Sequence, residues 1–587
     1  MNKVERMAVG ALVVILIAWT YFGRPDLPDP ETIPDTDVPE EEVVPTEDPV
    51  IDDPSADIDE PSPEPAVEED PVEDVEEADE EPLPDPEIVT LTNEVFAVDF
   101  TSHGGGIEAV RLFDYDAAID RRGEPLELHF GDIPALRYDG IPGFDSPAIF
   151  SLEPMSDGMG IRVSHSSDSV RFTRTYLLSD DGYDITVRDS FENLIDETVP
   201  FSYLQLHGGN MELQEAGPGM RGMSYLGVDF LPVDARRVTH TSRRVRNYFG
   251  VGGGCGTPDL RNVPMTASER YDEEPMEWAA VKNKFFTQII EPLHGIEALE
   301  VKAGRRDDDD FVVSDIRAVL DIPAWELAAG ETQETEIAYY AGPKKYAILR
   351  QHGNQWADVM EFGRFFKWIC QLLLPVLNAI EFVVPGGYGV AVILLTIIVK
   401  LVFWPVTHKG TESMKRMQAI QPELKKLREK YKKDPKKLQE KQMLLYREHK
   451  VNPLAGCIPM VIQIPVFIGL FTVLRSAVEL RYARFLWISD LSEPEGLLSD
   501  VITFPASGLN ILPLLMTATM VLQQRLTPSA GDPQQQKMMA FMPVMMLFIF
   551  YNMPSGLVLY WSVSQALSIV QLYLQRRKGS GLKPVTA

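Results

Sequence analysis

The pattern of hydrophobic and polar positions divides the 587 residues into segments of different character. An apolar run at 7–22 follows Lys3 and Arg6, and no small-residue cleavage site comes after it. Such a run is typical of a signal anchor that stays in the membrane, with its flanking cations in the cytoplasm. We therefore predict an N-terminal transmembrane helix within residues 1–25.

Residues 88–345 show short runs in which apolar and polar positions alternate, separated by turn residues. The clearest case is a hairpin over 170–187, whose two arms meet at Asp180–Gly182. Alternation with a period of two is typical of strands that bury one face. The segment is long enough for a sizeable core, so we predict a large all-β domain of sandwich type.

Beyond residue 345 the apolar stretches become long enough for helices. Residues 346–387 mix aromatic, apolar and charged side chains, which suits an amphipathic helix at the membrane interface. Stronger apolar stretches within 388–575 predict five membrane-spanning helices, so that six crossings are expected with the anchor. These stretches are 388–406, 453–474, 509–523 and 538–574, the last containing two helices joined at Pro554–Gly556.

Residues 408–452 predict a cytoplasmic helical hairpin, because apolar residues recur at steps of three and four and Asp434-Pro435 breaks the helix. An ordinary helix pair with a solvated basic face explains this pattern. A docking surface for anionic lipid, ribosomal nucleic acid or acidic targeting factors explains it equally. The candidate docking residues are Lys425, Lys426, Arg428, Lys432 and Lys433.

Charge refines this picture in two places. The net charge of -34 comes mostly from residues 26–87, which are rich in Pro, Asp and Glu, contain no Lys or Arg, and predict a disordered linker. The basic hairpin and the short tail 576–587 belong in the cytoplasm by the positive-inside rule. Both termini are then cytoplasmic, and the β domain lies on the opposite side of the membrane.

One cation interrupts the apolar stretch 394–407, LLTIIVKLVFWPVT. A charge at the centre of a membrane helix costs about 2.5–3.5 kcal/mol, so Lys400 either snorkels to the interface or faces a partner or water. Thr396 shares its helix face at a spacing of four. Gln463 lies between prolines in the next apolar stretch, and several such polar residues together favour a shared hydrated cavity over snorkelling.

The sequence contains no phosphate loop, no HExxH and no GxSxG, and its cysteines have no metal-ligand spacing. Three histidines of the β domain, His103, His207 and His240, are scattered along the chain. We expect no catalytic residue, metal or cofactor, and hence no enzyme. The alternative is a membrane-anchored carbohydrate-modifying enzyme whose β domain is the active part.

Four stretches resemble the YidC insertase family of Gram-negative bacteria, which has mitochondrial and chloroplast relatives. They are SMKRMQAIQPELKKLREKYKKD (413–434), NPLAGCIPMVIQIPVF (452–467), ELRYARFLWISDLS (479–492) and MPSGLVLYW (553–561). WAAVKNKFF (278–286) and GPK (342–344) extend the resemblance weakly into the β domain. The resemblance implies a multi-domain membrane protein with a polytopic α-helical core of five helices, an anchor helix and a large periplasmic all-β supersandwich.

The resemblance also implies a groove that is open to the cytoplasm and lipid and closed toward the periplasm. The family has arginine where this chain has Lys400, which keeps the charge but loses the planar fork of donors. Thr396 and Gln463 match polar groove positions, whereas Phe467 and Trp561 match an apolar slide for substrate helices, and we place Tyr560 beside them.

The function implied by the resemblance is insertion of nascent membrane proteins into the inner membrane and assistance in their folding, alone or with the Sec translocon. The other implied partners are the lipid bilayer, the ribosome and the signal-recognition-particle receptor, and no specific nucleic-acid sequence is expected.

Overall fold

A computed structural model describes residues 84–579 of the chain, apart from 146–147, 157, 214–224, 243, 250–262, 307–311, 364, 433, 450–457, 498–507 and 527–532. The predicted anchor, nearly all of the linker and the end of the tail lie outside the described residues. So do Lys433, Cys255 and Cys457. Residues 84–87 of the linker form neither helix nor strand.

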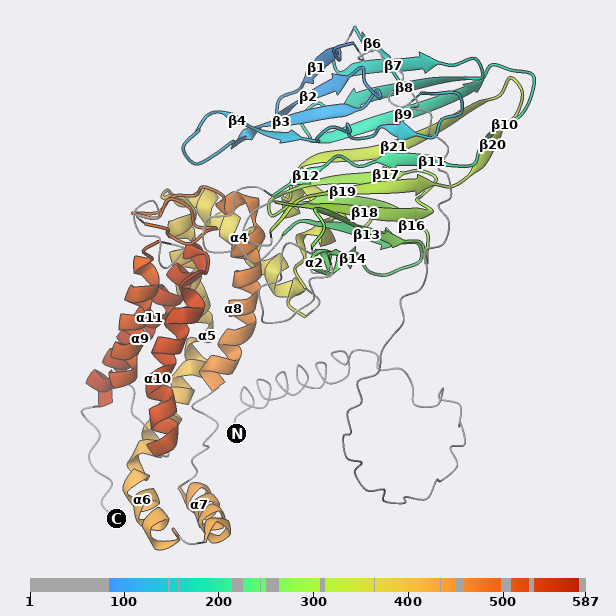
Figure 1. Cartoon of the computed structure of the whole chain (residues 1–587). Helices are drawn as coiled ribbons and strands as arrows, with labels where there is room; N and C mark the ends of the chain where they lie inside the picture. Colours follow the sequence, from blue (N-terminus) through green and yellow to red (C-terminus); the bar gives the residue numbers. More distant parts are fainter. Residues whose placement is uncertain are drawn as a thin grey trace, which may run out of the picture. The chain divides into compact units, whose positions relative to one another are not determined.

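The predicted all-β domain is present, and all its strand pairs are antiparallel (Figure 1). A nine-stranded sheet has the order β14 (Thr239–His240), β13 (Gly227–Pro232), β16 (Met276–Lys282), β17 (Phe286–Pro292), β21 (Thr332–Pro343), β9 (Asp184–Asn193), β8 (Val170–Leu178), β7 (Gly160–Ser166) and β6 (Ser151–Pro154). A six-stranded sheet has the order β15 (Thr266–Tyr271), β18 (Ala298–Arg305), β19 (Val313–Ile322), β11 (Leu204–His207) and β5 (Tyr138–Asp139), with β12 (Met211–Glu212) paired to β19.

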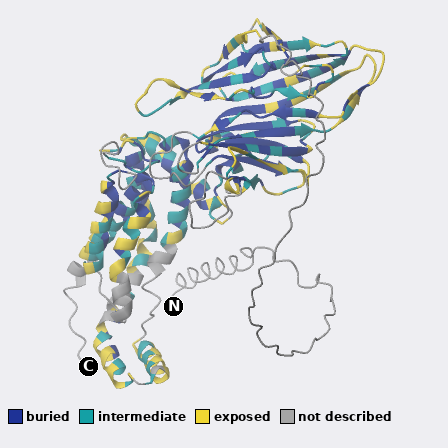
Figure 2. Ribbon diagram, viewed as in Figure 1, coloured by how far each residue is buried: buried dark blue, intermediate teal, exposed yellow. Residues whose placement is uncertain are grey.

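Two smaller sheets complete the domain. One consists of β1 (Ile88–Thr92), β2 (Phe96–Thr101), β3 (Ile107–Asp116) and β4 (Pro125–His129), and the other pairs β10 (Val199–Phe201) with β20 (Trp325–Leu327). The hairpin predicted over 170–187 is confirmed, because β8 and β9 pair from Val170 opposite Asn193 to Leu178 opposite Ile185. Buried apolar side chains of the sheets form one continuous core. Figure 2 colours the buried residues of the ribbon dark blue.

The first helical part of the chain, residues 346–387, differs from the prediction. The single amphipathic helix predicted over 346–387 is wrong in its extent, since the segment contains α3 (Tyr346–Leu349), the 3-10 helix η3 (Trp356–Met360) and α4 (Lys367–Val383). Glu361 and Gly363 adopt positive φ angles of 51° and 71°, which no helix can continue through. α4 is nevertheless amphipathic, with Leu373, Leu374 and Leu377 buried and Phe382 fully on the outside.

The membrane-type helices are α5 (Gly387–Ala419), α8 (Ile458–Ser476), α9 (Ile511–Leu526), α10 (Pro533–Phe550) and α11 (Ser555–Gly579). α11 packs against α9, α5 and α8, while α4 packs against α5 and α8 (Figure 1). The predicted break between α10 and α11 is confirmed, but it lies at 551–554, and Ser555 and Gly556 already belong to α11. Among the described residues, two helical segments are long and apolar enough to cross a membrane, Gly387–Pro405 and Ser555–Leu574, and the count of six crossings stays a prediction.

The predicted hairpin forms, but its first arm differs from the prediction. α5 continues through Pro405 as one helix to Ala419, so that the apolar stretch and the start of the arm are continuous. α6 (Gln421–Lys430) and α7 (Pro435–Glu448) follow. The break at Asp434-Pro435 is confirmed, because the Asp434 carboxylate accepts the N–H of Lys437 at 3.1 Å and caps α7.

Candidate functional site

Polar side chains of α5 and α11 face each other. Lys400 is half-buried, and its Nζ donates a hydrogen bond to Ser568 Oγ at 3.0 Å. Two turns further along α5, Thr407 Oγ1 accepts a hydrogen bond from Gln571 Nε2 at 3.4 Å. These four residues lie in helices that are otherwise strongly apolar. Placing a cation among apolar helices costs free energy, and charged residues at such positions are usually functional. The contact between α5 and α11 is therefore a functional candidate.

α8 and α11 bring together four of the residues predicted from the sequence. Gln463 Nε2 donates a hydrogen bond to Tyr560 OH, and Tyr560 is buried. Phe467 and Trp561 meet edge to face with ring centroids 5.2 Å apart. Phe550 of α10 joins them at 5.7 Å from Phe467 and 5.2 Å from Trp561. Phe467 and Trp561, two of the residues predicted for the slide, therefore belong to an aromatic cluster formed by three helices.

Trp561 of this cluster and Gln565, one turn further along α11, each have a buried polar atom. Among the described residues, neither Trp561 Nε1 nor Gln565 Oε1 has a hydrogen-bond partner, and both atoms are buried. Most buried polar groups in proteins have a hydrogen-bond partner, which makes these two atoms candidates for contact with a polar group of a substrate. Ser568 was not predicted as a site residue. It lies three residues after Gln565 on the same helix face, and this spacing was the available signal.

Thr396 occupies the predicted face of α5 but plays a more local role there. It is fully buried, and its Oγ1 donates to the carbonyl of Val392 in the preceding turn at 2.6 Å. Among the described residues, no hydrogen bond joins Lys400 to Thr396 or to Gln463. The predicted polar residues thus form two separate groups, one between α5 and α11 and one between α8 and α11.

The outer surface of these helices is apolar. Large hydrophobic side chains are exposed on α5, α8, α10 and α11, including Leu401, Val402, Ile464, Phe548 and Val570. Figure 2 shows exposed residues recurring along the helices, whereas the strands are mostly buried or intermediate. Exposed apolar side chains of this kind are expected on helices whose solvent is lipid.

The hairpin presents cations on its surface. Lys425, Lys426 and Lys432 are exposed, and Arg428 is half-buried. On the opposite side, Met417, Ile420 and Leu424 form a small core against Leu445 and Tyr446.

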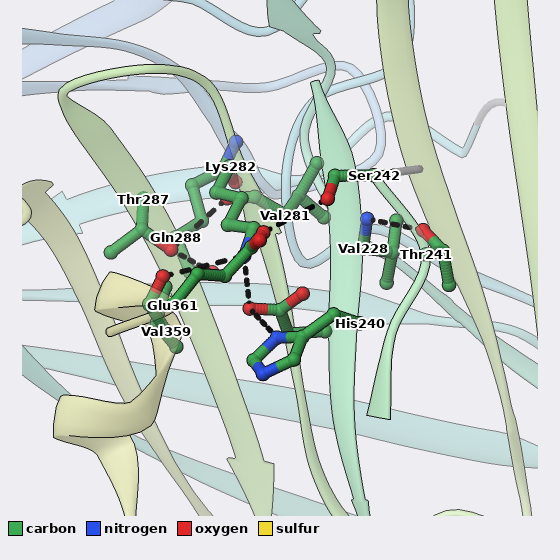
Figure 3. A network of polar contacts seen from close by, with 11 residues as sticks. Val228, His240, Thr241, Ser242, Val281, Lys282, Thr287, Gln288, Val359 and Glu361 are labelled. Carbon is green, nitrogen blue, oxygen red and sulfur yellow. Dashed lines mark hydrogen bonds and ion pairs between the residues drawn. The ribbon is translucent and has the colours of Figure 1, made fainter. Parts of the chain in front are cut away.

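The β domain contains a polar network that was not predicted from the sequence, shown in Figure 3. Lys282 of β16 donates to Asp229 of β13, to Glu361 Oε1 at 2.6 Å and to the carbonyl of Val359 at 3.3 Å. His240 Nδ1 lies 3.0 Å from Asp229 Oδ2. Asp229 and His240 lie opposite each other on the paired strands β13 and β14, whereas Lys282 and Glu361 come from distant segments, and no motif spacing connects the four.

The network resembles a metal site but already contains its cation. Ligand atoms of Asp229, His240 and Glu361 lie within 4.8 Å of one another. The Lys282 ammonium contacts both carboxylates, so its charge stands where a metal ion would bind. Burial opposes the charged form, but Asp229 and Glu361 outweigh it and raise the pKa of Lys282. Against the same burial effect, Lys282 lowers the pKa of Glu361 well below its usual range.

Family models match nearly all of the described chain. Residues 88–376 match the YidC periplasmic domain, and residues 380–581 match the 60Kd inner membrane protein. An insertase YidC from Geobacter sp. strain M21 is 31% identical over 508 residues, which is 83% of this chain and 85% of the relative. The chain belongs to the YidC family of membrane protein insertases.

Other YidC proteins are also similar to this chain. The relative from Syntrophobacter fumaroxidans is 37% identical over 386 residues, covering 64% of this chain and 67% of its own length. A solved structure described as an active YidC insertase has 16% identity and a TM-score of 0.33, covering 84% of this chain and 93% of that one. YidC membership places the all-β domain in the periplasm and the helices in the inner membrane. It gives no support to a carbohydrate-modifying enzyme.

Proposed function

We propose that this YidC insertase takes apolar segments of nascent membrane proteins from the cytoplasm into the bilayer through the space between α5, α8 and α11. The observation that carries the proposal is Lys400, a half-buried cation in an apolar helix whose Nζ lies 3.0 Å from Ser568 of the neighbouring helix. On the same helix as Ser568, Trp561 and Gln565 offer buried polar atoms to an incoming polar group. Thr396 and Gln463 complete the proposed groove.

In this mechanism Lys400 attracts the acidic or polar extramembrane segment of a substrate. The segment replaces Ser568 as a partner of the ammonium, which lowers the cost of leaving water. The apolar part of the substrate then passes Phe467, Tyr560 and Trp561 and moves sideways into lipid. Burial of apolar surface at about 25 cal/mol per Å² supplies the driving force, and no nucleotide, metal or cofactor is required.

The basic hairpin is the proposed docking surface on the cytoplasmic side. Its cations, Lys425, Lys426, Arg428, Lys432 and Lys433, suit anionic lipid headgroups, ribosomal nucleic acid or an acidic surface of the signal-recognition-particle receptor. Binding of this kind depends on charge and requires no specific nucleic-acid sequence. The chain acts alone or with the Sec translocon and then assists folding of the inserted protein.

The proposed topology has six crossings and both termini in the cytoplasm. Basic residues of the hairpin and of the tail support this orientation, because cations beside membrane helices stay in the cytoplasm. The boundaries that go with it are an anchor within 1–25, a linker over 26–87, an interfacial segment over 346–387 and a core over 388–575. The tail follows from residue 576.

The experiment that tests this function uses purified full-length chain in lipid vesicles. Vesicles that contain the chain should insert a single-span substrate with an acidic leading segment, whereas protein-free vesicles should not. Equal insertion with and without the chain would contradict the proposal.

A further inference from the structure

One short turn of the β domain contacts two segments that lead into the helices. The turn belongs to WAAVKNKFF (278–286) and connects β16 to β17. Lys282, before the turn, binds Glu361 in the segment that precedes α4. Lys284, within the turn, binds Glu493 in the segment that connects α8 to α9. Two lysines two residues apart thus connect the domain to the segment before α4 and to the segment between α8 and α9.

The turn is held in a fixed shape. Asn283 is buried, and its Oδ1 accepts the N–H groups of Phe285 at 3.0 Å and Phe286 at 2.9 Å. Its Nδ2 donates to the carbonyl of Glu212 at 3.3 Å. An Asn side chain that bonds the next backbone amides makes a rigid turn, so the direction of the Lys284 side chain is set by the domain.

Lys284 is withdrawn from water together with its partner. The exposed fractions of the Lys284 and Glu493 side chains are 7% and 14%. The ammonium binds the Glu493 carboxylate, donates to the carbonyl of Ser492 at 3.1 Å and lies 4.6 Å from the centre of the Phe285 ring. Removing one partner of a buried pair leaves an uncompensated buried charge. Its loss therefore costs more free energy than the loss of a surface ion pair.

The same segment holds the first turn of α11. The carbonyl of Glu493 accepts both the N–H of Ser555 at 2.8 Å and its hydroxyl at 2.7 Å. The carbonyl of Leu491 accepts the N–H of Gly556 at 2.8 Å. These bonds satisfy N–H groups that have no partner within the helix. Tyr560 and Trp561 lie only about 8 Å from Ser555 along the axis of α11, by helical rise.

The end of α8 lies at the same place. The Arg475 guanidinium in its last turn lies 5.1 Å from the Tyr225 ring, and the Lys284 ammonium lies 5.6 Å from that same ring. Phe467 is about 12 Å back along α8 by helical rise. The ends of α8 and α11 therefore meet the β domain around Lys284.

We propose that Lys284 and Glu493 are positioning residues for membrane insertion. They hold the ends of α8 and α11 together and thereby set the spacing at which Gln463 meets Tyr560 and Phe467 meets Trp561. The inference rests on the proposed function, because it assigns that aromatic cluster to the substrate path. Neither residue touches the substrate.

The test compares Lys284→Glu, Glu493→Lys and the double exchange in the full-length chain in nanodiscs. Spin labels at Ile464 on α8 and Val570 on α11, both on the exposed surface, report the spacing of the helices. Each single variant should broaden the distance distribution and slow insertion by about tenfold, since small misplacements of positioning elements have effects of this order. The double exchange should restore both quantities.

The matched control is Glu192→Lys, which breaks the exposed Arg171–Glu192 pair of the same domain and should change neither quantity. Should a charge reversal prevent folding, Glu493→Gln removes the charge with little change in shape. A distance distribution unchanged by Lys284→Glu and Glu493→Gln would overturn the inference. A broadened distance distribution together with a wild-type insertion rate would also overturn the inference, but it would not contradict the proposed function. If the aromatic cluster of the wild-type chain never contacted a substrate, the proposed function itself would be contradicted.

Discussion

Lys400 of α5 donates a hydrogen bond to Ser568 of α11 across 3.0 Å. An ammonium has three donors, so this bond leaves capacity for a substrate carboxylate. We predict that Lys400→Ala slows insertion of a substrate with an acidic leading segment by about tenfold, equivalent to about 1.4 kcal/mol. Insertion rates in reconstituted vesicles measure the effect. The matched control is Lys400→Arg, which keeps the charge and should retain most of the rate.

Ser568→Ala removes the hydrogen-bond partner of Lys400 and keeps the charge of the lysine. Because the serine only holds the ammonium at rest, its loss should leave the charge available and change the rate much less than Lys400→Ala. Wild-type rates for Lys400→Ala with every substrate would remove the electrostatic part of the mechanism.

Stability of the β domain depends on the buried pair of Arg174 and Asp189. The guanidinium donates to both carboxylate oxygens, at 2.6 and 2.7 Å, and both side chains are almost fully buried. We predict that Arg174→Met lowers the free energy of unfolding by about 3–5 kcal/mol, because Asp189 is left as an unpaired buried charge. Resistance of the domain to protease in increasing denaturant measures this loss.

Arg171→Met is the control for that prediction. Arg171 is exposed and pairs with exposed Glu192, and such pairs contribute about 0–1 kcal/mol. If the two variants lost protease resistance at the same denaturant concentration, the buried pair would have no special role.

Lys344 should make stability depend on pH. Burial, with the nearby charge of Lys282, lowers the pKa of Lys344 to about 7. In the unfolded chain the same group titrates near 10.4. Between these values the unfolded state binds more protons, so the free energy of unfolding should rise with pH by up to about 1.4 kcal/mol per unit and level off below pH 7.

The pH effect is measured by denaturant midpoints between pH 7 and 10 for wild type and Lys344→Met. The variant should be more stable at pH 7, and its midpoint should vary less over this range. Identical pH profiles for the two proteins would show that Lys344 is not held in its neutral form.

The all-β domain and the helical segments were predictable from the sequence for two reasons. Strands that bury one face alternate apolar and polar residues with a period of two, and helices that lie in lipid need long apolar stretches. β8 and β9 show this directly, and so does the turn before Ser555. The failure over 346–387 has a physical reason. Amphipathic composition cannot reveal that Glu361 and Gly363 take positive φ angles, which depend on tertiary contacts such as the one between Glu361 and Lys282.

The candidate site was predictable only in part. A charge in an apolar stretch indicates Lys400, and family resemblance indicates Gln463, Phe467 and Trp561. Ser568 escaped notice because a serine in an apolar helix is common, and only packing of α5 on α11 makes it a partner. Lys284 and Glu493 are 209 positions apart, and no local pattern connects such a pair.

Photo-crosslinking of a stalled nascent membrane protein tests the central claim most directly, namely that substrates pass between α8 and α11. The crosslinker is placed at Gln463, Phe467 or Trp561, with lipid-exposed Phe548 of α10 as the control position. We predict adducts from all three positions while the apolar segment is entering the membrane, and far fewer from Phe548. Adducts that are absent from the three positions, or equally frequent at Phe548, would contradict the account.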